Sequence, residues 1–155
     1  MGVFIQSINT VLVTVISGVA VFIIGEILQV TWLEPLQKYK KIKSEVVWAL
    51  MYYANIYSCV IVWPDADTLI QEKYKEAKDK MRIISCEVNG FAETMYWFHL
   101  GIPSKRRLIR AADNLMYLSN SLYMMNESRV KEMREKRNVE IAEKVYLELK
   151  IHRKS

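Results

Sequence analysis

Apolar residues fill the first part of the chain without the polar interruptions of a helix that faces water. From Val3 to Leu33 the sequence holds a single ionisable residue, Glu26. About twenty apolar residues are enough to cross the hydrocarbon core of a bilayer as a helix. Positive charge that flanks a span stays on the cytoplasmic side, and here four lysines follow it: Lys38, Lys40, Lys41 and Lys43. The pattern predicts a single-pass membrane protein, with a span over residues 1–34, its N-terminus outside, and a cytoplasmic domain over residues 35–155.

Small and hydroxyl-bearing residues recur inside this stretch at intervals that place them along one helix face. They are Thr10, Thr14, Ser17, Gly18 and Gly25, with Glu26 beside them. Membrane helices use such residues to approach each other closely, and a carboxylate within a span commonly faces a bundle or water. We therefore expect this face, the membrane seam, to support self-association. The alternative is a helix end that only places Glu26 among the headgroups.

Beyond Pro35 the apolar positions keep a helical period through four more segments. They cover residues 36–60, 68–100, 105–125 and 127–154. No segment alternates as a strand would, so the sequence predicts an all-α protein, with an N-terminal transmembrane helix followed by a small bundle of about four helices. Pro35 should mark a kink or a restart at the membrane surface. The uncharged run 46–63 leaves open a second membrane crossing.

Several residues have an expected place in these helices. Gly101 should stop the segment before it, and Ser104 should cap the segment after it. Asp65 or Asp67 should cap the helix that starts near residue 68. The final helix should turn Val130, Met133, Ile141, Val145 and Leu149 inward, and the segment before it Leu108, Ala111, Ala112, Leu115, Leu118 and Leu122. Cys59 and Cys86 lie among apolar neighbours, so we expect two core thiols.

The net charge of the chain narrows the classes of partner that it is expected to bind. The formal net charge is +5, and Glu26 is the only charge before Glu34, so the remainder carries +6. Such an excess favours anionic partners: acidic lipid, nucleic acid or nucleotides. No phosphate-binding loop, nucleophile motif or metal-ligand spacing is present, so we expect neither an enzyme nor a bound cofactor or metal.

A basic turn is the most distinctive feature of the cytoplasmic part. It comprises Ser104, Lys105, Arg106, Arg107 and Arg110. Four cations thus fall in the first two turns of a helix, the end at which the macrodipole disfavours positive charge. Free backbone N–H groups at that end bind anions, and arginine matches phosphate with paired hydrogen bonds. The sequence predicts a phosphate-binding site here; a solvated turn and a contact with acidic lipid are the alternatives.

Aromatic and amide residues gather around this turn. Tyr96, Trp97 and His99 precede it, and Asn114 follows it, with Tyr117, Ser119, Asn120, Ser121 and Tyr123 further along. Nucleobases stack on aromatic rings, and asparagine can pair with adenine. Tyr96, Trp97, His99 and Asn114 are therefore candidates for contacts with a base, although each ring could instead belong to the core.

The span, the lysine-rich junction, the Ile102–Arg107 turn and the Leu118–Ser121 segment together give the chain a resemblance to a known family. It resembles small bacterial membrane proteins with one N-terminal span and a helical cytosolic domain. That family includes the type III CRISPR membrane effector gated by cyclic tetra-adenylate. The resemblance implies a cytosolic domain that binds the cyclic nucleotide as a tetramer, and a span that then disrupts or depolarises the membrane.

Two other functions remain open from the residues alone. The chain could be an inner-membrane scaffold whose basic helices bind acidic lipid or a protein partner. It could also be a constitutive pore-forming toxin. Duplex nucleic acid is not an expected partner in any of these interpretations.

Overall fold

The computed structural model describes residues 2–59, 67–95, 101–122 and 128–151, with the backbone alone for residues 2–10 and 128–130. Every regular element in these ranges is a helix, and none of the described residues lies in a strand. The elements are α1 (Gly2–Leu28), the π-helical η1 (Gln29–Leu33), α2 (Glu34–Tyr52), α3 (Ala54–Ser58), α4 (Thr68–Thr94), α5 (Lys105–Ser121) and α6 (Ser128–Glu148). The predicted all-α class, a long apolar helix followed by about four helices, is confirmed.

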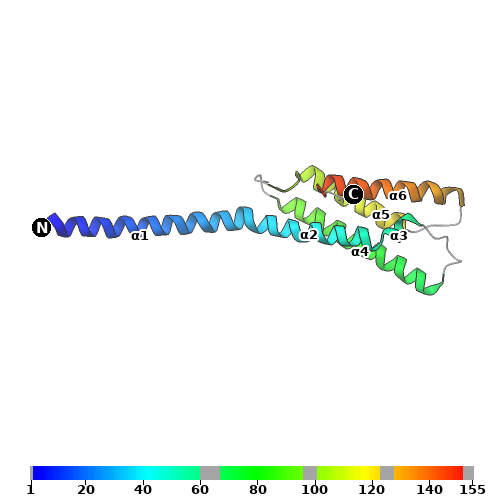
Figure 1. Ribbon diagram of the computed structural model, residues 1–155, viewed down its shortest axis with the longest axis horizontal. Coiled ribbons are helices and arrows are strands. Elements are labelled where there is room, and N and C mark those ends of the chain that lie inside the picture. The colour runs from blue at the N-terminus through cyan, green and yellow to red at the C-terminus, as the bar shows by residue number, and fades with distance from the viewer. Residues whose placement is uncertain (1, 60–66, 96–100, 123–127, 152–155) are drawn as a thin grey trace.

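Helix α1 projects away from the rest of the molecule (Figure 1). Its described side chains are exposed, as Phe22 illustrates with 67% of its surface accessible. So large an exposed apolar surface indicates contact with lipid or with a partner protein. By length and composition, this continuous helix is one that can cross a membrane.

The chain passes Pro35 without leaving the helix. The backbone N–H of Glu34 bonds to the carbonyl of Gln29, a five-residue step that defines the π turn η1. In an α-helix the Pro35 ring would crowd the carbonyl of Thr31, and a wider turn just before it relieves that contact. The expected kink or restart is thus a local widening, and α1, η1 and α2 follow nearly one line in Figure 1.

Helices α4 and α5 pair closely because small residues and serines line their contact. Ser85 Oγ donates to the Ala112 carbonyl at 2.7 Å, and Ser119 Oγ donates to the Lys78 carbonyl at 2.8 Å. A hydroxyl reaches the backbone of a neighbouring helix only when the two helices lie near each other. The predicted inward face of α5 is confirmed: Leu108, Ala111, Ala112, Leu115, Leu118 and Leu122 are all buried.

Helices α2 and α3 form another wall of the bundle. Val46 and Leu50 are fully buried there, so one face of the uncharged run packs into the core, whereas Trp48, Met51 and Tyr52 on its other side are exposed. Tyr53 donates to Glu76 Oε1 at 2.9 Å. Burial and then this acceptor raise the pKa of Tyr53 to about 12. The side-chain amide of the fully buried Asn138 donates to the Tyr57 carbonyl at 3.0 Å, so α6 holds α3 in place.

Three local expectations were wrong. Helix α4 ends at Thr94, not near residue 100, because the chain becomes extended at Met95. Met133 is 72% exposed, since the inward face of α6 at that end passes through the half-buried Arg134 and the buried Asn138. Both cysteines are exposed rather than buried: Cys86 lies about 100° around α4 from the buried Ser85 and so falls outside the buried face, and Cys59 lies just after α3.

The remaining expectations for individual residues have mixed outcomes. Ile141, Val145 and Leu149 are buried as predicted. Asp67 occupies the N-cap position of α4, but its side chain makes no capping hydrogen bond. Asp65 and the side chain of Val130 lie outside the described residues.

Candidate ligand-binding site at the α5 N-terminus

The turn before α5 depends on Gly101, whose φ is +87°, a conformation that favours glycine. Ile102 and Pro103 are then buried, and Ser104 takes the N-cap position in an extended conformation. The Ser104 carbonyl accepts the N–H groups of Arg107 and Leu108, whereas its side chain makes no capping bond. The predicted cap is therefore right in position, and its hydroxyl remains exposed at the helix end.

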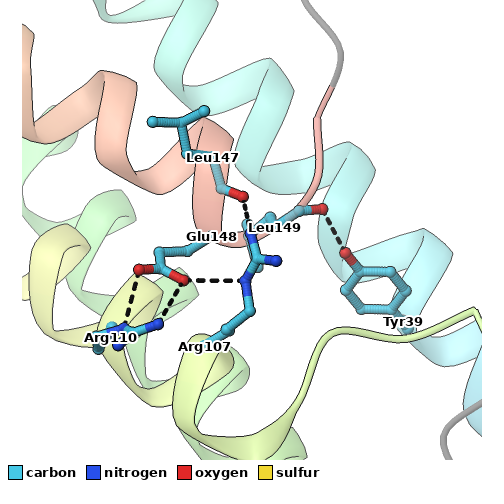
Figure 2. Close-up of polar contacts among 6 residues, drawn as sticks. All are labelled: Tyr39, Arg107, Arg110, Leu147, Glu148 and Leu149. Atoms are coloured by element: carbon cyan, nitrogen blue, oxygen red, sulfur yellow. Dashed lines mark hydrogen bonds and ion pairs between the residues drawn. The ribbon is translucent and has the colours of Figure 1, made fainter.

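Two arginines of this turn converge on one carboxylate, Glu148 of α6 (Figure 2). Arg107 Nε lies 3.1 Å from Glu148 Oε2, and Arg110 Nε lies 2.9 Å from Glu148 Oε1. Arg110 Nη2 also donates to Oε2, at 3.2 Å. We call Arg107, Arg110 and Glu148 the Glu148 cluster. In this structure its carboxylate occupies the position that an anionic ligand of the two arginines would take.

The end of α6 explains why so much positive charge is tolerated at the start of α5. Arg107 donates to the Leu147 carbonyl, and Tyr39 Oη donates to that of Leu149 at 2.6 Å (Figure 2). Lys43 Nζ donates to the Lys150 carbonyl at 2.9 Å. The last carbonyls of a helix carry partial negative charge. Arg107 of α5 and Lys43 of α2 therefore cap the end of α6, and for Arg107 this offsets the repulsion by the N-terminal dipole of α5.

The other cations of the turn are in different situations. Lys105 Nζ lies 2.6 Å from Glu93 Oε2, with both side chains about half exposed, an arrangement that contributes about 0.2–1 kcal/mol. Arg106 is exposed and has no ion pair or side-chain hydrogen bond to any described residue. Arg106 is thus the one cation of the turn whose guanidinium stands open to solvent with no contact to the described chain.

The predicted base-binding residues are only partly placed. Asn114 is half-buried and lies one turn after Arg110 on the same face of α5. Tyr96, Trp97 and His99 lie outside the described residues. Their contact with a base therefore stays a prediction.

The residues that sequence reasoning missed are Glu93, Glu148, Tyr39 and Lys43. Glu148 is one of many acids in a charged helix, and about forty residues separate it from its arginines. More than a hundred residues separate Tyr39 from the carbonyl that it meets. Local sequence patterns do not indicate which distant residues meet, so these contacts could not be predicted from the sequence.

Tyr39, at the same end of the bundle, has a strongly raised pKa. It lies in α2 beyond the apolar stretch, with 4% of its surface exposed. Burial raises the pKa of Tyr39 to about 12, against a smaller opposing effect of the Arg107 charge. Because the pKa of this phenol is higher in the folded protein than in the unfolded chain, its neutral form stabilises the folded state. That contribution is complete below about pH 10 and is lost as pH rises toward 12.

We expect the Tyr39→Phe variant to lose about 1 kcal/mol of stability at pH 8, because the Leu149 carbonyl loses its donor. The gap to the wild type should narrow between pH 10 and pH 12. Unfolding free energies of both proteins in detergent at pH 8 and pH 11.5 measure this. A gap that is constant with pH would contradict a buried neutral phenol at this position.

The described side chains of the membrane seam are exposed in the single chain. Thr14, Ser17 and Glu26 are exposed, and Ser17 Oγ bonds only within its helix, to the Val13 carbonyl at 2.7 Å. A methyl group built at Gly18 or Gly25 would meet no atom within 4 Å. Thr10 lies in α1, where the backbone alone is described. The described part of the seam is therefore exposed, and its role in association stays a prediction.

Comparison with known proteins adds no assignment. No protein family model, curated protein or solved structure matches the chain. Within the described parts of the chain, no group of histidine, cysteine and acidic side chains could hold a metal ion. The geometry and the sequence pattern are therefore the basis for inferring a function.

Proposed function

We propose that the chain is a membrane effector, not an enzyme, in which a cytoplasmic helical bundle receives a phosphate-bearing ligand and passes the change to the span. The observation that carries this proposal is the unbroken helix from Val11 to Tyr52. Its first part is apolar and exposed, and its last part is a wall of the bundle. A rearrangement of the bundle is thus transmitted mechanically toward the membrane.

The ligand of this proposal is a cyclic oligoadenylate such as cyclic tetra-adenylate. Its identity comes from the resemblance, and the cations of the α5 turn are suited to its phosphates. Lys105, Arg106, Arg107 and Arg110 bind the phosphates, with Ser104 at the helix end. Asn114 and the rings of Tyr96, Trp97 and His99 contact the adenines.

Ligand binding requires an exchange of anions at the Glu148 cluster. A phosphate takes the place of the Glu148 carboxylate on Arg107 and Arg110, since both anions use the same donors. Because Glu148 joins α6 to both arginines and Arg107 also caps α6, the exchange loosens α6 from α5 and from the Tyr39 side of α2. The bound state therefore differs from the free state at the helix that continues into the membrane.

The assembly of this proposal is a tetramer in the bacterial inner membrane, with the N-terminus outside and the bundle in the cytoplasm. A fourfold ligand favours a closed assembly because it binds the oligomer better than the monomer. The membrane seam then packs against its copies, and Glu26 moves toward a water-filled interior. Disruption or depolarisation of the membrane follows, which fits a role in antiphage defence.

The test is dye leakage from liposomes that contain the full chain, on addition of cyclic tetra-adenylate. We expect leakage from the wild type. The Arg106→Gln variant should bind the nucleotide about tenfold more weakly, because a charge-assisted hydrogen bond is worth about 1.5–3 kcal/mol. Its thermal stability should not change, since Arg106 has no partner among the described residues.

Lys73→Gln is the matched control, because it removes one exposed positive charge from α4, outside the proposed site. It should leak like the wild type. Equal binding and leakage in the Arg106→Gln variant would remove the α5 turn as the ligand site.

A second candidate function is an inner-membrane scaffold whose basic helices lie on acidic lipid. It is favoured by the exposed Lys38, Lys40 and Lys41 in the first turns of α2, immediately after the apolar helix. Each such cation contributes about 1 kcal/mol near an anionic surface. Native mass spectrometry of the full chain that finds no cyclic oligoadenylate bound would select this function over the effector.

A further inference from the structure

A second basic site lies between α5 and α6, away from the Glu148 cluster. It is a groove of about 300 Å³, lined by Tyr117, Asn120 and Ser121 of α5 and by Met133, Arg134 and Arg137 of α6. We call it the α5–α6 groove. The lining residues follow Arg110 on α5 and precede Glu148 on α6, so the groove lies toward the other end of this helix pair. That end points away from α1 in Figure 1.

The groove presents donors and an aromatic face. Among the described lining residues no side chain is acidic, whereas two are arginines. The Arg137 guanidinium lies over the Tyr117 ring at 5.1 Å. This cation–π contact holds the Arg137 guanidinium against the face of the Tyr117 ring. Arg137 forms no ion pair with any described carboxylate, so its charge is not neutralised from within the described chain.

A third arginine sets the orientation of the amide in the groove. Arg82 of α4 donates Nη2 to Asn120 Oδ1 at 3.1 Å. Because this bond uses the Asn120 carbonyl oxygen, the Asn120 NH₂ group remains to serve as a donor. Arg82, Arg134 and Arg137 thus approach one groove from α4 and α6. Like charges that are brought together in this way favour an anion between them.

We infer that the α5–α6 groove is a binding site for a nucleoside monophosphate. The phosphate binds to Arg134 and Arg137, because guanidinium groups pair with phosphate oxygens. The base lies against the layer formed by Arg137 and Tyr117, since bases stack on both arginine planes and aromatic rings, and Asn120 NH₂ donates to its edge.

Size and position exclude two other anions. The volume of about 300 Å³ lies at the lower limit of small-molecule sites, which suits one nucleotide and not a cyclic tetranucleotide. The groove lies toward the end of the bundle that points away from α1, so a lipid headgroup of the spanned membrane does not reach it. The site is therefore separate from the one proposed at the α5 turn, and it does not depend on that proposal.

The experiment is titration of the full chain in detergent micelles with adenosine 5′-monophosphate, with inorganic phosphate and adenosine as partial probes. We expect saturable binding of the monophosphate, and binding of each partial probe that is at least tenfold weaker. Arg137→Gln should weaken binding of the monophosphate about tenfold. Tyr117→Leu should weaken it more than it weakens binding of inorganic phosphate, because the ring contacts only the base.

Asn120→Asp is the variant that separates binding from folding. It keeps the acceptor for Arg82, so the fold should keep its thermal midpoint, but it adds a negative charge that repels phosphate. We expect at least a tenfold loss of monophosphate binding, whereas Lys73→Gln should bind as the wild type does. The inference is overturned if the wild type binds no monophosphate at millimolar concentration, or if Asn120→Asp and Arg137→Gln both bind it unchanged. Either result leaves leakage triggered by cyclic tetra-adenylate, and hence the proposed function, unaffected.

Discussion

Insertion of eleven Gly/Ser residues after Leu33 should abolish ligand-triggered leakage and leave ligand affinity unchanged. In the structure the span and α2 are parts of one continuous helix. The inserted segment separates them. A Gly/Ser segment behaves as a flexible coil, so a rotation or shift of α2 would be lost before it reaches the membrane seam. The ligand site lies in the bundle, and its affinity should not depend on this junction.

An insertion of eleven residues built from Glu, Ala and Lys is the matched control. Such sequences are predominantly helical, and eleven residues make about three turns at about 3.6 residues per turn. The control therefore has the same length as the Gly/Ser insertion but preserves stiffness and the relative facing of the two segments. It should retain most of the leakage. Full leakage from both insertions would mean that clustering alone drives the membrane effect.

Replacement of Glu148 by Gln should tighten binding of cyclic tetra-adenylate about tenfold while it lowers stability. The carboxylate pairs with two arginines and is itself 20% exposed, so its loss should cost about 1 kcal/mol. The same loss frees Arg107 and Arg110 from the anion that competes with the phosphate. Calorimetric titration and thermal unfolding of the full chain in detergent measure the two effects, which have opposite signs.

Glu93→Gln is the control for this prediction. Glu93 pairs only with Lys105 among the described cations, and that contact is about half exposed. Its replacement should change affinity and stability by much less than that of Glu148. Unchanged or weaker nucleotide binding by Glu148→Gln would mean that Arg107 and Arg110 serve only to hold α6 against α5, with no ligand role.

The sequence by itself determined the features that depend on neighbours along the chain. The apolar stretch Val3–Leu33 predicted a helix able to cross a membrane, and the inward face of α5 was predicted residue by residue. The first follows from the length of an apolar run and the second from helical periodicity, and both are local properties of the chain. The same reasoning failed for Met133, where the inward face at that end of α6 shifts to Arg134 and Asn138, and for Cys86, whose apolar neighbours do not determine the side of α4 on which it lies.

Tertiary structure alone decided how the charges are used. The cations of the α5 turn are evident in the sequence, but the partners of Arg107 and Arg110 come from α6 and were not predictable. The α5–α6 groove likewise joins Tyr117 and Asn120, which were noted as polar and aromatic residues, with Arg82 and Arg137, which were not. The physical reason is that charge and hydrogen-bond capacity are properties of each residue, whereas pairing depends on which helix ends the packed core brings together.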